Sequence, residues 1–294
     1  MIKRIAALSV SLLLILTGSL LAGASPALAA VSYYYAGGHQ NFTGTLPTYI
    51  IANVTVHAPA LDTSKDYHTL AELAIEKDVD NTSDGVTNPT RNIVEVGWTV
   101  DNIVFGDTNP HLWVGRWVNG VFGGYNTGFV NCNSCVAGQP DNWDAGDTLT
   151  AGTTMRMGAQ YCSTGCTAGW WVWAYINGAT AEWLGYFPAT TWTGATPAVT
   201  TFTDGAQVHA FGEMATETSL GGPGCTDEGD GNFASAGPPA TGALISSVTL
   251  GGIATGSVNI TAVSVVTDPT KFNKVDLGTP GNIRSFRYGG PGAC

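Results

Sequence analysis

The sequence has few charged residues, and few of these are basic. Lysine and arginine together number 11 of 294 residues, against 22 aspartates and glutamates, and the formal net charge is −11. Such a chain is not expected to bind nucleic acid, because phosphate backbones are held by clusters of positive charge. The acidic balance fits either the solubility of an exported protein or work in an acidic medium.

Long apolar runs are also scarce. The exception is at the N-terminus, where Lys3 and Arg4 precede a mostly apolar stretch, 5–21, and Ala27-Leu28-Ala29 fits the small-residue cleavage pattern. We therefore predict a signal peptide over residues 1–29 and a secreted, extracellular chain over residues 30–294. No later stretch is long and apolar enough to span a bilayer, so no membrane contact is expected after cleavage.

Cysteine is sparse but even in number, with six residues. In an exported chain this predicts three disulfides. Cys132 and Cys135, like Cys162 and Cys166, are close enough to close small loops, which leaves Cys225 to bond the terminal Cys294. A redox or zinc role for the Cys132-x-x-Cys135 motif lacks the expected histidines or βαβ context.

Several familiar catalytic motifs are missing as well. There is no Gly-x-Ser-x-Gly motif, and no thiol is left free to act as a nucleophile. The acidic segments around Asp80 and Asp227 do not match the twelve-residue calcium loop. We expect neither a metal nor a cofactor.

Glycine is abundant, with 39 residues, and short runs of β-forming residues alternate with turns. This pattern predicts a single all-β domain, an antiparallel β-sandwich of two packed sheets. For Thr69–Lys77 both helical and strand spacing fit, so its structure stays open. The expected strands are Tyr49–Val56, Ile93–Val100, His111–Trp117, Thr153–Tyr161, Trp170–Ile176, Ala206–Met214, Ile245–Leu250 and Ser257–Val266.

Two of these strands carry a glutamate on the face that should not be core. Val94, Val96, Trp98 and Val100 alternate on one face, which leaves Glu95 on the other. In the second strand Val208, Ala210 and Met214 alternate in the same way, opposite Gln207, His209, Phe211 and Glu213. Two carboxyl groups that meet across a cleft are the minimum equipment for general acid–base hydrolysis.

These segments carry a family resemblance. Residues 93–100 followed by Phe105-Gly106-Asp107 are similar to the E-x-G-W-x-V…Y-G-D signature of the neprosin family, secreted glutamic endopeptidases. Similar segments follow in the family's order: Thr127-Gly128-Phe129-Val130 before Cys132 and Cys135, Gly169-Trp170-Trp171-Val172, Leu184-Gly185-Tyr186-Phe187-Pro188, Phe211-Gly212-Glu213-Met214 and Tyr288-Gly289-Gly290-Pro291-Gly292-Ala293-Cys294.

The resemblance implies a cleft across one sheet, a catalytic pair at Glu95 and Glu213, and cleavage of peptide bonds after proline at acidic pH. Tyr33 follows the signal segment almost directly, so we expect a member without the propeptide of the plant enzymes. We also expect a monomer. Nothing in the sequence separates the roles of the two glutamates; we assign Glu95 as the base and Glu213 as the acid.

Other residues are expected to bind substrate. Trp171, Trp173 and Tyr175 share a strand face that would form an aromatic floor for a proline-containing peptide, unless both faces are buried. Glu72, roughly where the family has a glutamine, could orient the substrate amide or simply be solvated. His209 could tune Glu213 or be an ordinary hydrogen-bonded histidine, and Phe211 stands where the family has tryptophan.

Two other functions fit the same residues. A retaining glycoside hydrolase also places two carboxyl groups in a cleft rich in tryptophan. A binding module could keep the sandwich without any activity. Cleavage products from peptides, from glycans or from neither would separate the three hypotheses.

Overall fold

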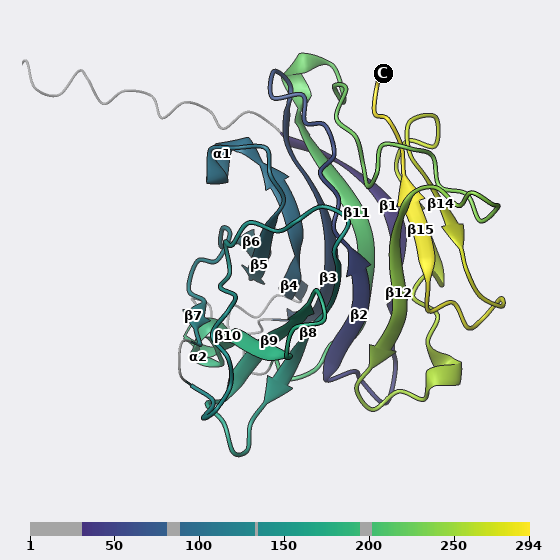
Figure 1. Ribbon diagram of the computed structural model, residues 1–294. Coiled ribbons are helices and arrows are strands. Elements are labelled where there is room, and N and C mark those ends of the chain that lie inside the picture. The colour runs from purple at the N-terminus through teal and green to yellow at the C-terminus, as the bar shows by residue number, and fades with distance from the viewer. Residues whose placement is uncertain (1–30, 81–88, 133–134, 195–201) are drawn as a thin grey trace, which may run out of the picture. The chain divides into compact units, whose positions relative to one another are not determined.

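The structure is a computed structural model that describes residues 31–80, 89–132, 135–194 and 202–294. The predicted signal peptide lies outside the described residues. Residues Val31–Cys294 form one compact unit built from two antiparallel sheets (Figure 1). This confirms the β-sandwich that the alternating pattern predicted. Within the described ranges, no helix has the length and apolar character needed to cross a bilayer.

The first sheet has seven strands in the order β13-β1-β11-β3-β4-β5-β6. It is the sheet that carries both glutamates of interest, on β4 and β11. Its strands are β1 (Val31–Asn41), β3 (Asp66–Asp80), β4 (Pro89–Asp101), β5 (His111–Val118), β6 (Val121–Phe122), β11 (Gln207–Glu217) and β13 (Val263–Val266).

The second sheet has eight strands in the order β14-β15-β12-β2-β8-β9-β10-β7. Its strands are β2 (Tyr49–Thr55), β7 (Val130–Asn131), β8 (Thr154–Cys162), β9 (Gly169–Ile176), β10 (Glu182–Pro188), β12 (Ala243–Leu250), β14 (Asn273–Asp276) and β15 (Phe286–Gly289). The helical turns are short: α1 (Asn102–Phe105), α2 (Thr190–Thr193), η2 (Thr218–Leu220) and η3 (Thr255–Ser257).

The core lies between the sheets because alternate side chains of each strand point inward. On β4 and β11 the buried apolar residues are the predicted ones, each 0% exposed: Val94, Val96, Trp98, Val100, Val208, Ala210 and Met214. The indole Nε1 of Trp98 donates to the carbonyl oxygen of Thr55 on β2 at 2.9 Å, so a buried donor is satisfied across the two sheets. Glu95 and Glu213 therefore project from the face opposite the core.

Three segments show where sequence patterns fail. Residues 69–77 lie in β3, because pairing with β11 on one side and β4 on the other satisfies their backbone groups as a strand. The prediction of a strand over Ser257–Val266 is wrong for its first half, since only Val263–Val266 pairs with β1. The strand β1 itself was not predicted. Its Gly37 interrupts the pattern, and a Cβ there would overlap the backbone of β11.

The three disulfides are those predicted. Cys132 bonds Cys135, Cys162 bonds Cys166, and Cys225 bonds Cys294. The first two join residues three and four positions apart, whereas the third joins residues 69 positions apart. Only the third therefore holds distant parts of the chain together.

We expect the Cys225–Cys294 bond to contribute most to stability, because a cross-link restricts the unfolded chain more when it closes a longer loop. Replacing both cysteines with serine should lower the free energy of unfolding by about 4 kcal/mol, against about 2 kcal/mol for the Cys132–Cys135 pair. Urea denaturation of the two double variants measures this difference. Equal losses would contradict the loop-length argument.

Candidate active site

A cavity of about 190 Å³ opens on the face of the seven-stranded sheet that points away from the core. The sheet supplies almost all of its walls, and Tyr125 closes it from the loop between β6 and β7. The side chains that line it are Tyr33, Tyr35, His68, Leu70, Glu72, Ala74, Arg91, Ile93, Glu95, Trp113, Trp117, Phe122, Tyr125, His209, Phe211 and Glu213. Both predicted catalytic glutamates therefore reach one cavity.

Strand register places a third carboxyl group between these two. Glu72 on β3 is opposite Phe211 of β11 and Gly97 of β4. Glu213 and Glu95 are each two residues from those positions, so each is a diagonal neighbour of Glu72 across one strand pair. Diagonal neighbours on the same face of a sheet are close enough for long side chains to interact. The order across the sheet is thus Glu213, Glu72, Glu95.

Two of the three carboxyl groups have raised pKa values. Burial, and then the neighbouring Glu213, raise the pKa of Glu95 from 4.5 to about 8. Trp117 Nε1 donates to Glu95 Oε1 at 2.7 Å, which opposes the shift and fixes the carboxyl group in place. Burial, then Glu95 and Glu213, raise the pKa of Glu72 well above its ordinary value. At neutral pH Glu95 therefore holds its proton, and burial favours the protonated form of Glu72 as well.

A glycine makes room for the Glu95 carboxyl group. Gly115 of β5 is directly opposite Glu95 in the register. A Cβ placed there would lie 2.7 Å from Glu95 Oε2. Because such contacts are too short for a real side chain, glycine at this position keeps the carboxyl group free on that side.

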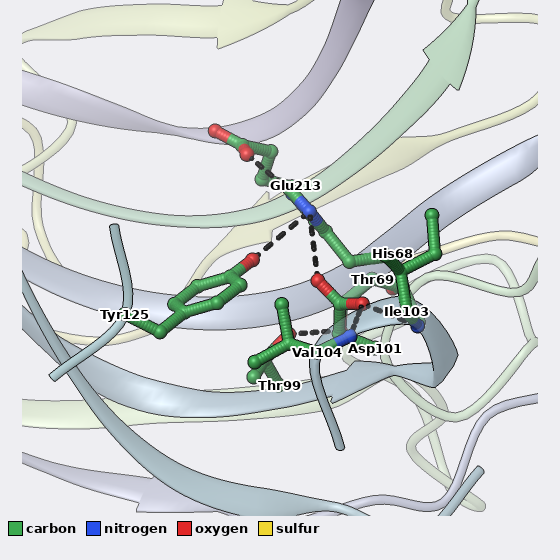
Figure 2. Close-up of polar contacts among 8 residues, drawn as sticks. All are labelled: His68, Thr69, Thr99, Asp101, Ile103, Val104, Tyr125 and Glu213. Carbon is green, nitrogen blue, oxygen red and sulfur yellow. Dashed lines mark hydrogen bonds and ion pairs between the residues drawn. The ribbon is translucent and has the colours of Figure 1, made fainter. Parts of the chain in front are cut away.

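Glu213 has a different environment, in which His68 is the nearest polar neighbour (Figure 2). His68 Nε2 lies 2.8 Å from Glu213 Oε1, and the other ring nitrogen, Nδ1, lies 3.0 Å from the Tyr125 hydroxyl. Nδ1 is also 3.9 Å from Asp101 Oδ2. His68 was not among the residues predicted from the sequence. The available signal was the alternation of β3, which puts His68 on the same face as Glu72.

Asp101 is itself fixed at the end of β4. Its Oδ1 accepts hydrogen bonds from the backbone N–H groups of Ile103 and Val104, both at 2.9 Å, and so caps α1. Only 3% of Asp101 is exposed, and it does not line the cavity. Its second carboxylate oxygen is left facing His68, as Figure 2 shows.

An ionised carboxylate, Glu76, lies just outside the cavity lining, bound by two residues that do line the cavity. Arg91 binds Glu76 with two contacts, Nε to Oε1 at 2.6 Å and Nη2 to Oε2 at 2.9 Å, and His209 Nε2 lies 2.6 Å from Glu76 Oε2. Burial of Glu76 acts to raise its pKa, but the bonds from Arg91 and His209 outweigh it and lower the pKa to about 2. His209 thus lines the cavity as predicted, but its ionic partner is Glu76 rather than Glu213.

The aromatic walls are not those expected from the sequence. Phe211 does line the cavity, where its ring lies edge-on to Tyr35 at 4.8 Å between centroids. Trp171, Trp173 and Tyr175 instead lie on β9, in the other sheet, and none lines the cavity. Their alternation distinguished the core face of β9 from its outer face, but it could not say which sheet β9 joins.

The chemistry of the cavity is that of protonated and ionised carboxyl groups beside a histidine. Within the ranges that the structure describes, no group of three or more His, Cys, Asp or Glu side chains is arranged to hold a metal ion. A neutral Glu95 can donate a proton, and a carboxylate at Glu213, next to His68, can accept one. Such a pair suits general acid–base hydrolysis.

We compared the chain with known proteins. No curated protein sequence matches the chain. Among solved structures, the crystal structure of scytalido-glutamic peptidase with a transition state analog inhibitor is similar, with a TM-score of 0.39 and 10% sequence identity over 88% of this chain and 100% of that one. The family model named Neprosin matches residues 66–291, a range that includes Glu72, Glu95 and Glu213. Because this match spans well over half of the sequence, the chain belongs to the neprosin family.

Proposed function

We propose that this protein is a secreted glutamic endopeptidase in which Glu95 and Glu213 together activate water to hydrolyse peptide bonds. Family membership supports a peptidase of the glutamic class. The observation that carries the proposal is that one cavity holds both glutamates in contrasting environments. Burial keeps Glu95 protonated to about pH 8, whereas Glu213 has a basic partner in His68.

These environments favour the reverse of the roles assigned from the sequence. The carboxylate of Glu213 takes a proton from water, and the resulting hydroxide attacks the carbonyl carbon of the scissile bond. Glu95 then gives its proton to the departing nitrogen as the C–N bond breaks. The new acid gains the oxygen from water and the new amine gains the proton from Glu95. The proton that Glu213 took from water then passes through solvent to Glu95, which restores both groups and balances the cycle. No metal or cofactor takes part in this proposal.

Glu72 has a separate role in this scheme. It lies between the two catalytic groups and is 4% exposed. With its pKa raised by burial and by both neighbours, Glu72 is a neutral hydrogen-bond donor over the working pH range. We expect it to donate to the carbonyl oxygen of the substrate and to hold the scissile amide between Glu213 and Glu95.

The remaining walls suit an extended peptide that contains proline. Tyr33, Tyr35, Phe211, Trp113 and Trp117 present rings around the carboxyl groups, and flat rings pack well against a pyrrolidine ring. We propose cleavage after proline by a monomer that acts outside the cell. The three disulfides fit an oxidising compartment.

The first test is mass-spectrometric mapping of a proline-rich peptide incubated with the mature chain between pH 3 and pH 9. We expect cuts after proline, and a loss of rate of about 100-fold or more in Glu95→Gln and in Glu213→Gln. Glu217→Gln is the matched control, because Glu217 lies on the same strand as Glu213 but outside the cavity. Intact peptide with folded wild-type protein at every pH would rule out the proposal.

The pKa of Glu95 predicts the alkaline limit of activity. An acid must be protonated to work, so activity should be present below the pKa of Glu95 and fall as the pH rises through about 8. The active range then extends from the acidic side into the neutral range. The profile of kcat/KM against pH measures this limit. A decline that is complete by pH 6 would show that Glu95 does not set it.

The raised pKa of Glu95 also predicts that the free energy of unfolding falls as the pH rises. Below pH 4.5 Glu95 is protonated in both the folded and the unfolded chain. As the pH rises from there toward 8, only the unfolded chain loses the proton, so the wild-type protein becomes less stable. Glu95→Gln cannot ionise, and its stability relative to the wild type should rise by roughly 1–3 kcal/mol between pH 4 and pH 8.

Chemical denaturation at the two pH values measures that difference. Glutamine retains an oxygen to accept the bond from Trp117, so packing is little changed. A constant difference between the two proteins across the pH range would contradict the assigned pKa.

A further inference from the structure

We infer that His68 is a positioning residue, which Asp101 and Tyr125 orient so that it holds Glu213 as an ionised, correctly aimed base. This inference rests on the proposed function and deepens it. The contacts form a chain from Asp101 through the two ring nitrogens of His68 to Glu213, as Figure 2 shows.

The distances support a chain of contacts in which Asp101 and Tyr125 orient His68, and His68 orients Glu213. His68 Nε2 lies 2.8 Å from Glu213 Oε1, within hydrogen-bond reach, so an N–H there donates to the carboxylate. On the other side of the ring, Tyr125 is in hydrogen-bond contact with Nδ1, while the Asp101 carboxylate is 3.9 Å away. A base oriented by a second group, which is oriented in turn by a third, is a recurring arrangement in hydrolases.

The local charges explain why such a partner is needed. Glu213 shares its cavity with Glu72, Glu95, Tyr33 and Tyr35, none of which carries positive charge. The buried Glu228 also acts electrostatically on Glu213 from outside the cavity. Among the described residues, His68 is the one basic side chain within ion-pair distance of Glu213, since Arg91 binds Glu76 at the far end. Glu213 is buried, and without a ring N–H from His68 nothing in the described ion pairs would offset the cost of burying its carboxylate.

Asp101 makes the inference testable without touching substrate. It lies outside the cavity lining, and its Oδ1 caps α1. Asparagine caps helices as well as aspartate does, so Asp101→Asn keeps the cap and removes the charge that faces His68. His68→Gln keeps a hydrogen-bond donor near Glu213 but can never be positively charged.

The test is the profile of kcat/KM against pH for His68→Gln and Asp101→Asn on the proline-rich peptide. In His68→Gln we expect the acidic side of the profile, where activity falls with falling pH, to move to higher pH by about one unit, because the carboxylate of Glu213 loses the imidazole that binds it at 2.8 Å. At the pH optimum of each protein kcat should fall about 10-fold with KM nearly unchanged. Asp101→Asn should shift the acidic side in the same direction but by less. The double variant should lose no more than His68→Gln alone, since Asp101 acts through His68.

His39→Gln is the matched control, because His39 lies on the same sheet but outside the cavity. If kcat/KM of a folded His68→Gln or Asp101→Asn variant falls at the same acidic pH as that of the wild type, the inference is wrong. Should His68→Gln fail to fold, Asp101→Asn alone decides the question. Absence of cleavage by the wild-type protein is a different outcome, which would overturn the proposed function itself.

Discussion

The pairing of β3 with β11 on one side and with β4 on the other fixes the relative positions of the three cavity carboxyl groups. Glu72 faces Phe211 and Gly97 across these pairings, so Glu213 and Glu95 become its diagonal neighbours. A slip of one residue would turn every side chain of a strand to the opposite face. Here it would expose Trp98 and Met214, both 0% exposed, and bury carboxyl groups between the sheets. The hydrophobic core therefore fixes the geometry of the polar cavity.

Burying several carboxyl groups in and beside one cavity costs free energy, and the structure reduces this cost in two ways. Glu95 and Glu72 stay protonated, because burial and mutual repulsion raise their pKa values. Glu76 instead stays ionised, because Arg91 and His209 bind it directly. The side chain that a basic group can reach is ionised, and the one that it cannot reach is neutral. The proposed reaction requires a similar contrast, between Glu95 as the proton donor and Glu213, beside His68, as the proton acceptor.

The sequence predicted some parts of the site well and others poorly. Alternation on β4 and β11 placed Glu95 and Glu213 away from the core, because a strand has only two faces. The same alternation on β9 could not place Trp171, Trp173 and Tyr175, since it carries no information about which strands become neighbours. Alternation also could not predict which glutamate acts as the acid and which as the base. The roles that we propose rest on Trp117 and His68, which contact Glu95 and Glu213 from positions 22 and 145 residues away in the chain.

The sequence by itself determined the all-β class, the three disulfides, the core faces of the main strands and the family signature. Most of these depend on residues that are near one another in the chain or that repeat with a fixed period; the Cys225–Cys294 bond followed because the other four cysteines form two local pairs. Only the tertiary structure decided that β3 lies between β4 and β11, that His68 meets Glu213, and that His209 pairs with Glu76 instead. These contacts join residues far apart in the sequence, and a carboxyl group takes its pKa from whichever of them surround it in the folded chain.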